Sequence, residues 1–127
     1  YRMINPNEHT VFPLPYNLTP TKADKYLDDK EIIQFNNNEL EIIHTPGHTE
    51  GSISIIDKTG KNIFSGDLIF KESIGRTDLP GGNFDEIINS IAKLMEYEDD
   101  FSIFSGHGEE TTIDHEKSYN PFIINYL

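Results

Sequence analysis

Cysteine is absent from the 127 residues of the chain. Neither a disulfide bond nor a zinc–thiolate site can therefore form, so any bound metal must be held by histidine and carboxylate side chains. The apolar runs are only a few residues long, far short of a membrane-spanning helix. The first residues also lack the long apolar stretch of a signal peptide. We therefore expect a cytoplasmic protein that makes no contact with a membrane.

Positive charge is scarce, because 10 Lys and Arg residues are outnumbered by 22 Asp and Glu residues, for a net charge of −12. Proteins that bind nucleic acid need a basic face, so nucleic acid is not an expected partner. An anionic substrate would be repelled unless a few cations were concentrated near its site. The composition, with 35% hydrophobic and 25% charged residues, is typical of one globular domain.

Short runs of β-forming residues, separated by turn-forming residues, predict a mostly antiparallel sheet. Three asparagines at 36–38 favour a hairpin turn, since asparagine tolerates left-handed backbone geometry, and residues 57–60 favour a second hairpin. The expected strands are residues 31–35, 39–44, 52–57, 61–65 and 101–105, with a further short strand at 1–4.

The clearest helix spans residues 83–97, where the apolar side chains fall on one face. Asn83 can cap its first turn, with Glu86 as the reciprocal partner. A shorter helix at 111–118 is expected to end before the Asn-Pro pair that follows it, and residues 21–29 are expected to form a helical turn.

Two segments are expected to be loops: the proline-rich residues 5–20 and the long irregular stretch at 68–82. The order of strands and helices favours an α/β (α+β) fold, with helices on one face of the sheet. The other face has no evident cover within the chain.

Three predicted strands are each followed by a glycine next to a potential metal ligand: His48, Asp67 and His107. Glycine lets the backbone come close to a bound group. Two imidazoles and one carboxylate suit zinc, iron or manganese. Because a carboxylate has two oxygens, Asp67 is the natural bridge between two metals that share a water and lower its pKa. We therefore predict that these three side chains converge at one rim of the sheet.

Two cations, Lys71 and Arg76, lie in the long loop after the Gly-Asp pair. In a chain this acidic, an arginine near the metal site can hold a substrate carboxylate through two hydrogen bonds. It can equally form an internal salt bridge with Asp78 or Asp85. The sequence leaves both possibilities open.

The remaining histidines are not expected to bind metal. A Pro-Gly pair between His44 and His48 forbids the helix that would bring both to one ion, so His44 is expected to be a strand residue or the partner of a ligand. His9, in the proline-rich loop, and His115, on the short helix, are expected at the surface.

Taken in order, these motifs resemble those of the metallo-β-lactamase superfamily, and most closely its glyoxalase II-like (hydroxyacylglutathione hydrolase-like) branch. The resemblance covers roughly residues 31–123. It rests on the segments TPGHT at 45–49, SGDLIF at 65–70, GRTDLPGG at 75–82, SGHG at 105–108, TT at 111–112 and NPF at 120–122.

The resemblance implies a hydrolase with two divalent metal ions. Zinc is the expected metal, with iron or manganese as alternatives. In such enzymes the residue matched by His48 binds the first metal, the catalytic residue matched by Asp67 bridges both, and the residue matched by His107 binds the second. A metal-bridging hydroxide attacks a small-molecule thioester such as S-lactoylglutathione. The position matched by Arg76 is basic and lies near the carboxylates of the substrate, and Lys71 is our second candidate for substrate binding.

One family motif, His-x-His-x-Asp-His, supplies most ligands of both metals and has no match in this chain. The family fold is a four-layer αββα sandwich of two sheets, and the chain matches its second half. We therefore expect residues 1–127 to be the C-terminal part of one domain, with the N-terminal half of the same domain as partner. The 127-residue chain alone is expected to be inactive.

Two other functions stay open. A mononuclear iron persulfide dioxygenase-like enzyme would also accommodate residues 75–78, and metal content would separate it from a hydrolase with two metals. A non-catalytic half-domain would instead act as an interaction module, because exposed apolar sheet surface normally marks an interface. Such a module would pair with itself as a homodimer or bind another partner.

Overall fold

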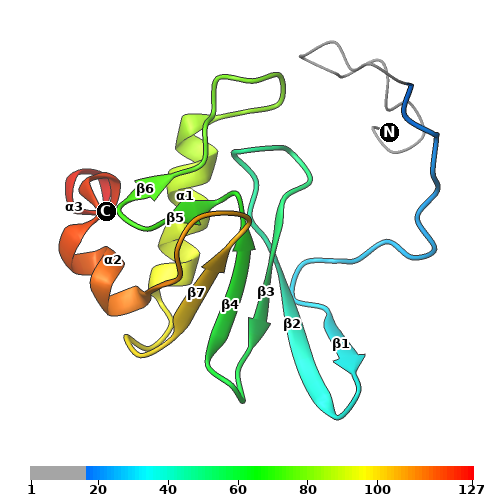
Figure 1. Cartoon of the computed structure of the whole chain (residues 1–127), viewed down its shortest axis with the longest axis horizontal. Coiled ribbons are helices and arrows are strands. Elements are labelled where there is room, and N and C mark those ends of the chain that lie inside the picture. Colours follow the sequence, from blue (N-terminus) through cyan, green and yellow to red (C-terminus); the bar gives the residue numbers. More distant parts are fainter. Residues whose placement is uncertain (1–16) are drawn as a thin grey trace.

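The computed structural model describes residues 17–127. Figure 1 shows a twisted sheet with the helices gathered against one side of it. The strands are β1 (Ile32–Phe35), β2 (Asn38–His44), β3 (Ile53–Asp57), β4 (Asn62–Gly66), β5 (Ile69–Phe70), β6 (Ser73–Ile74), β7 (Ser102–Ser105) and β8 (Thr111–Thr112), and the helices are α1 (Phe84–Met95), α2 (Ile113–Tyr119) and α3 (Pro121–Tyr126). The α/β fold predicted from the sequence, with a mostly antiparallel sheet, is confirmed.

Six strands form the main sheet in the order β1-β2-β3-β4-β7-β8, and β5 and β6 form a small separate hairpin. All neighbours in the main sheet are antiparallel except β4 and β7, which run parallel. The chain returns from β4 to β7 through the hairpin and α1 (Figure 1). Consequently β2, β4 and β7 all run in the same direction and end at the same edge of the sheet.

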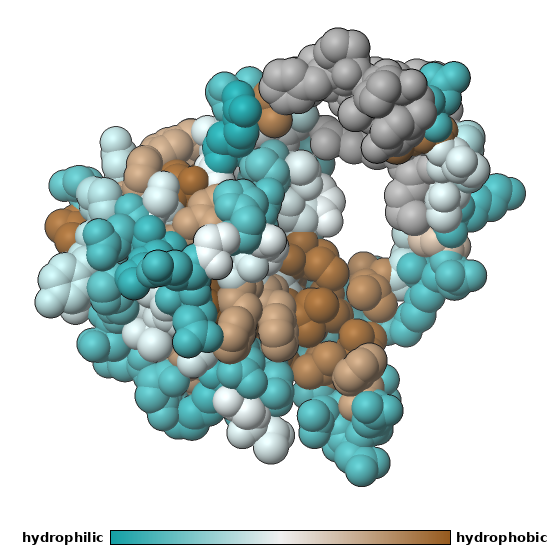
Figure 2. Space-filling view, viewed as in Figure 1, coloured by the Kyte–Doolittle hydropathy of each residue, from teal (hydrophilic) through white to brown (hydrophobic). Residues whose placement is uncertain are grey.

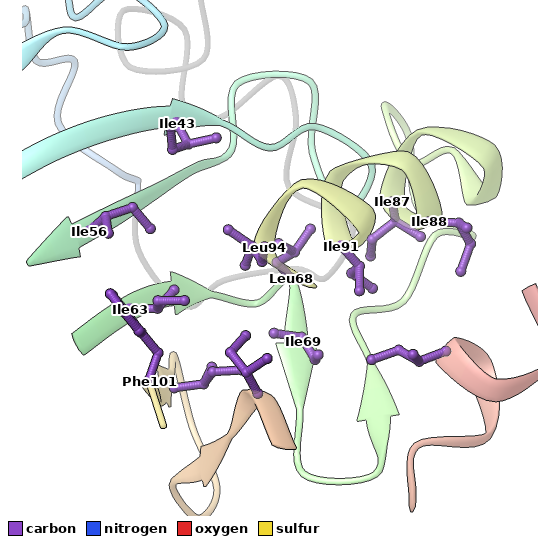
Figure 3. Packing of buried hydrophobic residues seen from close by; sticks show 13 residues of the cluster. Ile43, Ile56, Ile63, Leu68, Ile69, Ile87, Ile88, Ile91, Leu94 and Phe101 are labelled. Atoms are coloured by element: carbon purple, nitrogen blue, oxygen red, sulfur yellow. The ribbon is translucent and has the colours of Figure 1, made fainter. Parts of the chain in front are cut away.

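Helix α1 covers one face of the sheet through an isoleucine-rich stripe, and its N-terminus is capped by Asn83, whose side chain accepts a hydrogen bond from the Glu86 amide. Figure 3 shows this stripe packed against side chains from β3 and β4 and from the hairpin. The cluster includes Ile56, Ile63, Leu68, Ile69, Ile87, Ile91, Leu94 and Ile103, each no more than 1% exposed. The core therefore lies between the sheet and the helices.

The opposite face of the sheet carries apolar side chains, and no helix within residues 17–127 covers them. Strand alternation places Ile53, Ile55, Phe64 and Phe104 on this face, and Phe64 is 44% exposed and stacked on Phe104. Figure 2 shows apolar residues gathered in the middle of this side of the molecule. We call this surface, defined by these four residues, the open face.

Several sequence predictions need correction. Residues 21–29 form no helix, because an isolated polar turn has no apolar face to bury. The stretch at 68–82 is not wholly irregular, since it contains the β5–β6 hairpin, whose two-residue strands are too short to show alternation. The second helix starts at Ile113 rather than 111, since Thr111 pairs with Ile103 in β8.

Helix α3 was not anticipated, although the Asn-Pro pair that begins it is a good helix start, with Asn120 as cap and Pro121 in the first turn. The strand predicted at residues 1–4 and most of the loop predicted at 5–20 lie outside the described residues.

Candidate metal centre

The three predicted ligands follow the three strands that end at one edge of the sheet. His48 lies in the loop after β2, Asp67 directly follows β4, and His107 comes two residues after β7. Nε2 of His48 lies 3.6 Å from Oδ2 of Asp67, and Nε2 of His107 lies 3.8 Å from Oδ1 of the same carboxylate. The side chains therefore converge, as the sequence predicts, with Asp67 between the two imidazoles.

Helix α1 fixes the loop that carries His48. Three successive groups of the helix bind backbone carbonyls at the start of this loop: the Asn83 amide binds Gly47, the Ser90 hydroxyl binds Pro46, and the Lys93 ammonium binds His44, at 2.7–2.9 Å. Gly47 has φ +133°, and a Cβ there would overlap with the backbone of Ile87. Glycine is thus required for the loop to pack against the helix.

The tautomer of the neutral His48 ring follows from its hydrogen bond. Its Nδ1 lies 2.9 Å from the backbone carbonyl oxygen of Arg76. A carbonyl oxygen can only accept, so Nδ1 carries a proton and donates it. In the neutral imidazole, Nε2 then presents a lone pair toward the Asp67 carboxylate. A lone pair and a carboxylate oxygen at this separation can both bind a cation placed between them.

Close backbone contacts place the Asp67 carboxylate. The register between β4 and β7 shifts at Gly66, and the Gly106 amide binds the Gly66 carbonyl at 2.8 Å. A Cβ on Gly106 would overlap with Oδ1 of Asp67. The absence of a side chain at Gly106 therefore leaves room for the carboxylate between the two histidines.

His107 is the most accessible of the three, with 72% of its side chain exposed against 21% for His48 and 36% for Asp67. Its imidazole stacks on the ring of Phe70, with ring centroids 4.4 Å apart. Phe70 belongs to the β5–β6 hairpin, which the sequence did not reveal. This stack helps to hold the exposed ring in place.

The donor set fits a divalent metal. Separations of 3.6 and 3.8 Å are too long for hydrogen bonds, and they are near the ~3.4 Å that separates two ligands of one tetrahedral zinc ion. Within residues 17–127, no three His, Cys, Asp or Glu side chains form the ligand set of a single ion. The geometry instead pairs each imidazole with one oxygen of Asp67, and this pattern suits a bridging carboxylate.

Both candidate substrate-binding cations are paired with acids of the chain. Arg76 forms two hydrogen bonds of 2.8 Å with Asp78, which holds the pKa of Asp78 at about 2, below its usual 3.8. Lys71 binds Glu109 at 2.9 Å, and the pair raises the pKa of the lysine and lowers that of the glutamate. Of the alternatives for Arg76, the salt bridge with Asp78 is the one present, and substrate binding by either cation stays a prediction.

A shallow pocket of about 420 Å³ adjoins His107. It is lined by Phe70, Lys71, Ser73, His107, Gly108 and Glu109. A second hollow of about 440 Å³ lies between β2 and the end of α1, and none of the three predicted ligands lines it. The pocket beside His107 could therefore hold a substrate near the predicted metals.

The other histidines lie mostly where the sequence placed them. His44 ends β2, and its Nε2 lies 2.9 Å from the Glu50 carbonyl, across the loop that carries His48. His115 is on α2 but only partly exposed, because it contacts Glu72. His9 lies outside the described residues.

One buried acid near the site was missed. Glu116 is fully buried and contacts the turn of the β5–β6 hairpin. The sequence held a signal at this position: the residues that are buried on α2 and α3 recur at helical spacing, and two of the four are polar. They are Ile113, Glu116, Asn120 and Ile123.

Within residues 17–127, no helix is long and apolar enough to cross a membrane. The model of the metallo-beta-lactamase superfamily matches residues 2–107. The hydroxyacylglutathione hydrolase GloC of Haemophilus influenzae is 41% identical over 120 residues, which are 93% of this chain and 56% of that protein. The probable metallo-hydrolase YqgX of Bacillus subtilis is 37% identical over 86% of this chain and 52% of its own length. The chain thus spans about half the length of the curated relatives it matches.

Solved structures agree with these relatives. The BLEG-1 B3 metallo-beta-lactamase superposes with a TM-score of 0.79 at 38% identity, over 83% of this chain and 51% of its own. ETHE1 from Myxococcus xanthus superposes with a TM-score of 0.73 at 29% identity, over 78% of this chain and 45% of its own. TTHA1623, in a di-iron-bound form, superposes with a TM-score of 0.73 at 32% identity, over 81% of this chain and 50% of its own.

Proposed function

The chain belongs to the metallo-beta-lactamase superfamily, and on that premise we propose that the whole protein is a metal-dependent hydrolase of thioesters such as S-lactoylglutathione. The observation that carries the proposal is the convergence of His48 and His107 on the two oxygens of Asp67. The likeness to hydroxyacylglutathione hydrolase GloC supports the substrate class.

The proposed ligand roles follow the geometry. His48 would hold one metal, His107 a second, and Asp67 would contribute its carboxylate to both. Zinc suits this set of ligands, as do iron and manganese, and the di-iron form of TTHA1623 supports a pair of metals. When bound, such a pair lowers the pKa of a shared water and polarises a carbonyl oxygen.

The other residues of the chain position the substrate and the ligands. The carbonyl oxygen of Arg76 keeps the proton of His48 on Nδ1. Phe70 orients the ring of His107. Lys71, in the pocket beside His107, and the Arg76 guanidinium are the proposed partners for carboxylates of the substrate.

Two ligands for each metal are fewer than the usual four, so the proposal requires further ligands from the rest of the protein. The chain covers 56% of the length of GloC. We therefore assign the missing ligands to an N-terminal half of the same domain, which would also cover the open face.

The test uses the full-length protein. We expect about two metal ions per molecule by elemental analysis, and hydrolysis of S-lactoylglutathione that is lost on chelation and restored by zinc, iron or manganese. Asp67→Asn should reduce both metal content and hydrolysis, whereas Glu96→Gln, on the exposed end of α1, should change neither. A fully metallated protein that hydrolyses no thioester would rule the proposal out.

The likeness to ETHE1 keeps a second candidate, a mononuclear iron persulfide dioxygenase-like enzyme. Such an enzyme would hold one iron rather than two metals. It would consume oxygen with glutathione persulfide and leave S-lactoylglutathione intact. Iron stoichiometry and an oxygen electrode separate the two functions.

A further inference from the structure

Glu116 is a fully buried acid, and its carboxylate accepts hydrogen bonds from three donor groups. The Glu72 amide lies 3.2 and 3.0 Å from its two oxygens. The Thr111 hydroxyl donates at 2.6 Å and the Asn120 side-chain amide at 2.7 Å. These donors are uncharged, and they come from three separate segments of the chain.

A carboxylate is the side chain that fits this set of donors. It offers two acceptor oxygens and no donor when ionised, whereas glutamine would turn an NH2 group toward one of these donors. Burying a carboxylate among neutral groups is unfavourable unless its oxygens are fully hydrogen-bonded. The acid at this position therefore makes contacts that an apolar residue could not make.

The segment that Glu116 holds is the turn of the β5–β6 hairpin. Glu72, in that turn, has φ +58°, a left-handed conformation that residues other than glycine rarely adopt. Its amide binds Glu116, and the next carbonyl, of Ser73, accepts a hydrogen bond of 3.0 Å from Asn120, itself bound to Glu116. Helix α2 thus fixes the hairpin through its turn.

The hairpin and the residues that follow it contact all three predicted ligands. Phe70 stacks on His107. The Gly75 backbone packs so closely on the Asp67 carbonyl that a Cβ there would overlap with it. The Arg76 carbonyl accepts the Nδ1 proton of His48. A shift of the hairpin would therefore disturb each ligand.

We propose that Glu116 is a positioning residue for the metal centre, acting through the turn of the β5–β6 hairpin. It touches neither metal nor substrate. The inference rests on the proposed function only in taking His48, Asp67 and His107 as the ligands.

The first measurement needs no metal. In the metal-free full-length protein, the Phe70 ring should shift the His107 ring protons upfield in the NMR spectrum, and Phe70→Leu gives the unstacked reference. Glu116→Gln should remove half or more of that shift and weaken the signal of the His48 Nδ1 proton. Asp114→Asn removes the same charge from an exposed position on the same helix and should change neither.

The second measurement uses the loaded protein. Glu116→Gln should weaken metal binding about 10- to 100-fold, as loss of a residue that orients a ligand typically does. It should lower kcat about 10-fold or more while KM changes less than about 2-fold. If Glu116→Gln does not fold, Thr111→Val removes one donor and keeps the carboxylate, and it should shift the His107 protons in the same direction by less.

Each outcome decides the proposal. Unchanged ring shifts in folded Glu116→Gln, or in Thr111→Val where that variant replaces it, would reduce Glu116 to a residue that serves stability alone. Equal losses of metal affinity in Asp114→Asn would overturn it too. If the ring shifts respond but the wild-type protein hydrolyses no thioester, the proposed function fails and the positioning role stands.

Discussion

The His48 imidazole and the Arg76 backbone are joined by a hydrogen bond of 2.9 Å from Nδ1 to the carbonyl oxygen. In the neutral imidazole this bond places the proton on Nδ1 and leaves the Nε2 lone pair, near Asp67, available to a metal. The contribution comes from the backbone, so it is independent of the arginine side chain. At position 76 the contact made by the carbonyl is thus separable from the substrate-binding role proposed for the guanidinium.

That separation makes Arg76→Ala a clean variant. The carbonyl remains, so kcat should stay within about 2-fold of the wild-type value. If the guanidinium holds a substrate carboxylate, KM for S-lactoylglutathione should rise about 10-fold, the loss expected for a charge-assisted contact in part replaced by solvent. Steady-state kinetics with a thioester that has no carboxylate give the comparison, because its KM should not change.

The control for that variant is Lys117→Ala, which removes an exposed cation of α2 that is paired with Asp99. It should leave both KM values unchanged. An equal rise for both thioesters in Arg76→Ala would mean that the side chain shapes the loop instead of binding the substrate.

The pair of Arg76 with Asp78 predicts a specific pH dependence. Arg76 lowers the pKa of Asp78 from 3.8 to about 2. Because the folded-state pKa is the lower one, the stabilising effect is present above about pH 4 and is lost as the pH falls toward 2. A carbon-13 NMR titration of the Asp78 carboxyl should give a midpoint near 2, moving toward 3.8 in Arg76→Ala. An unchanged midpoint in the variant would contradict the assignment, and 1 M salt should weaken the shift because both groups are exposed.

Gly106→Ala should disable the site without unfolding the protein. The new methyl group would overlap with Oδ1 of Asp67, which would push the carboxylate out of line with both imidazoles. A displacement of about 1 Å at a catalytic group can lower the rate about 100-fold. We therefore expect about 100-fold lower kcat/KM and reduced metal content. Gly51→Ala is the matched control, since a Cβ there meets nothing within 4 Å, and equal activity in both variants would refute the packing argument.

The sequence predicted the convergence of the three candidate ligands better than it predicted their surroundings. Each candidate follows a strand that ends next to glycine, and this local pattern singled out His48, Asp67 and His107. Their convergence needed one fact that local patterns do not contain: β4 and β7 run parallel. The long helix between them is the usual crossover for a parallel pair, so the direction could have been inferred.

What the sequence did not reveal depends on contacts between distant segments. The β5–β6 hairpin has strands of two residues, and its position is set by Glu116, 44 residues further along. The stack of Phe70 on His107 likewise joins segments that no periodicity connects. The pairing of Arg76 was one of two open alternatives, because a carboxylate two residues away and a substrate carboxylate offer an arginine the same chemistry.

Gly47→Ala should lower the stability of the fold by at least about 2 kcal/mol. The residue has φ +133°, which an L side chain rarely adopts, and the methyl group would overlap with the backbone of α1 at Ile87. Urea unfolding of the full-length protein measures the effect. Gly51→Ala, in the same loop, should remain within about 0.5 kcal/mol of the wild-type value. A loss below about 1 kcal/mol in Gly47→Ala would show that the loop can move away from the helix.

Phe64→Ala tests what covers the open face. Phe64 is 44% exposed in residues 17–127 and stacks on Phe104 with ring centroids 5.5 Å apart. If an N-terminal half of the same domain packs over it, truncation should reduce the free energy of unfolding of the full-length protein by about 3–5 kcal/mol. If nothing covers the face, only the contact between the two rings is lost, and the free energy of unfolding should fall by about 0.5–1.5 kcal/mol. Ile124→Ala, at a 58% exposed position of α3, is the reference for a surface truncation. A homodimer that covers the face would make the Phe64→Ala effect depend on protein concentration, which would exclude cover from within the same chain.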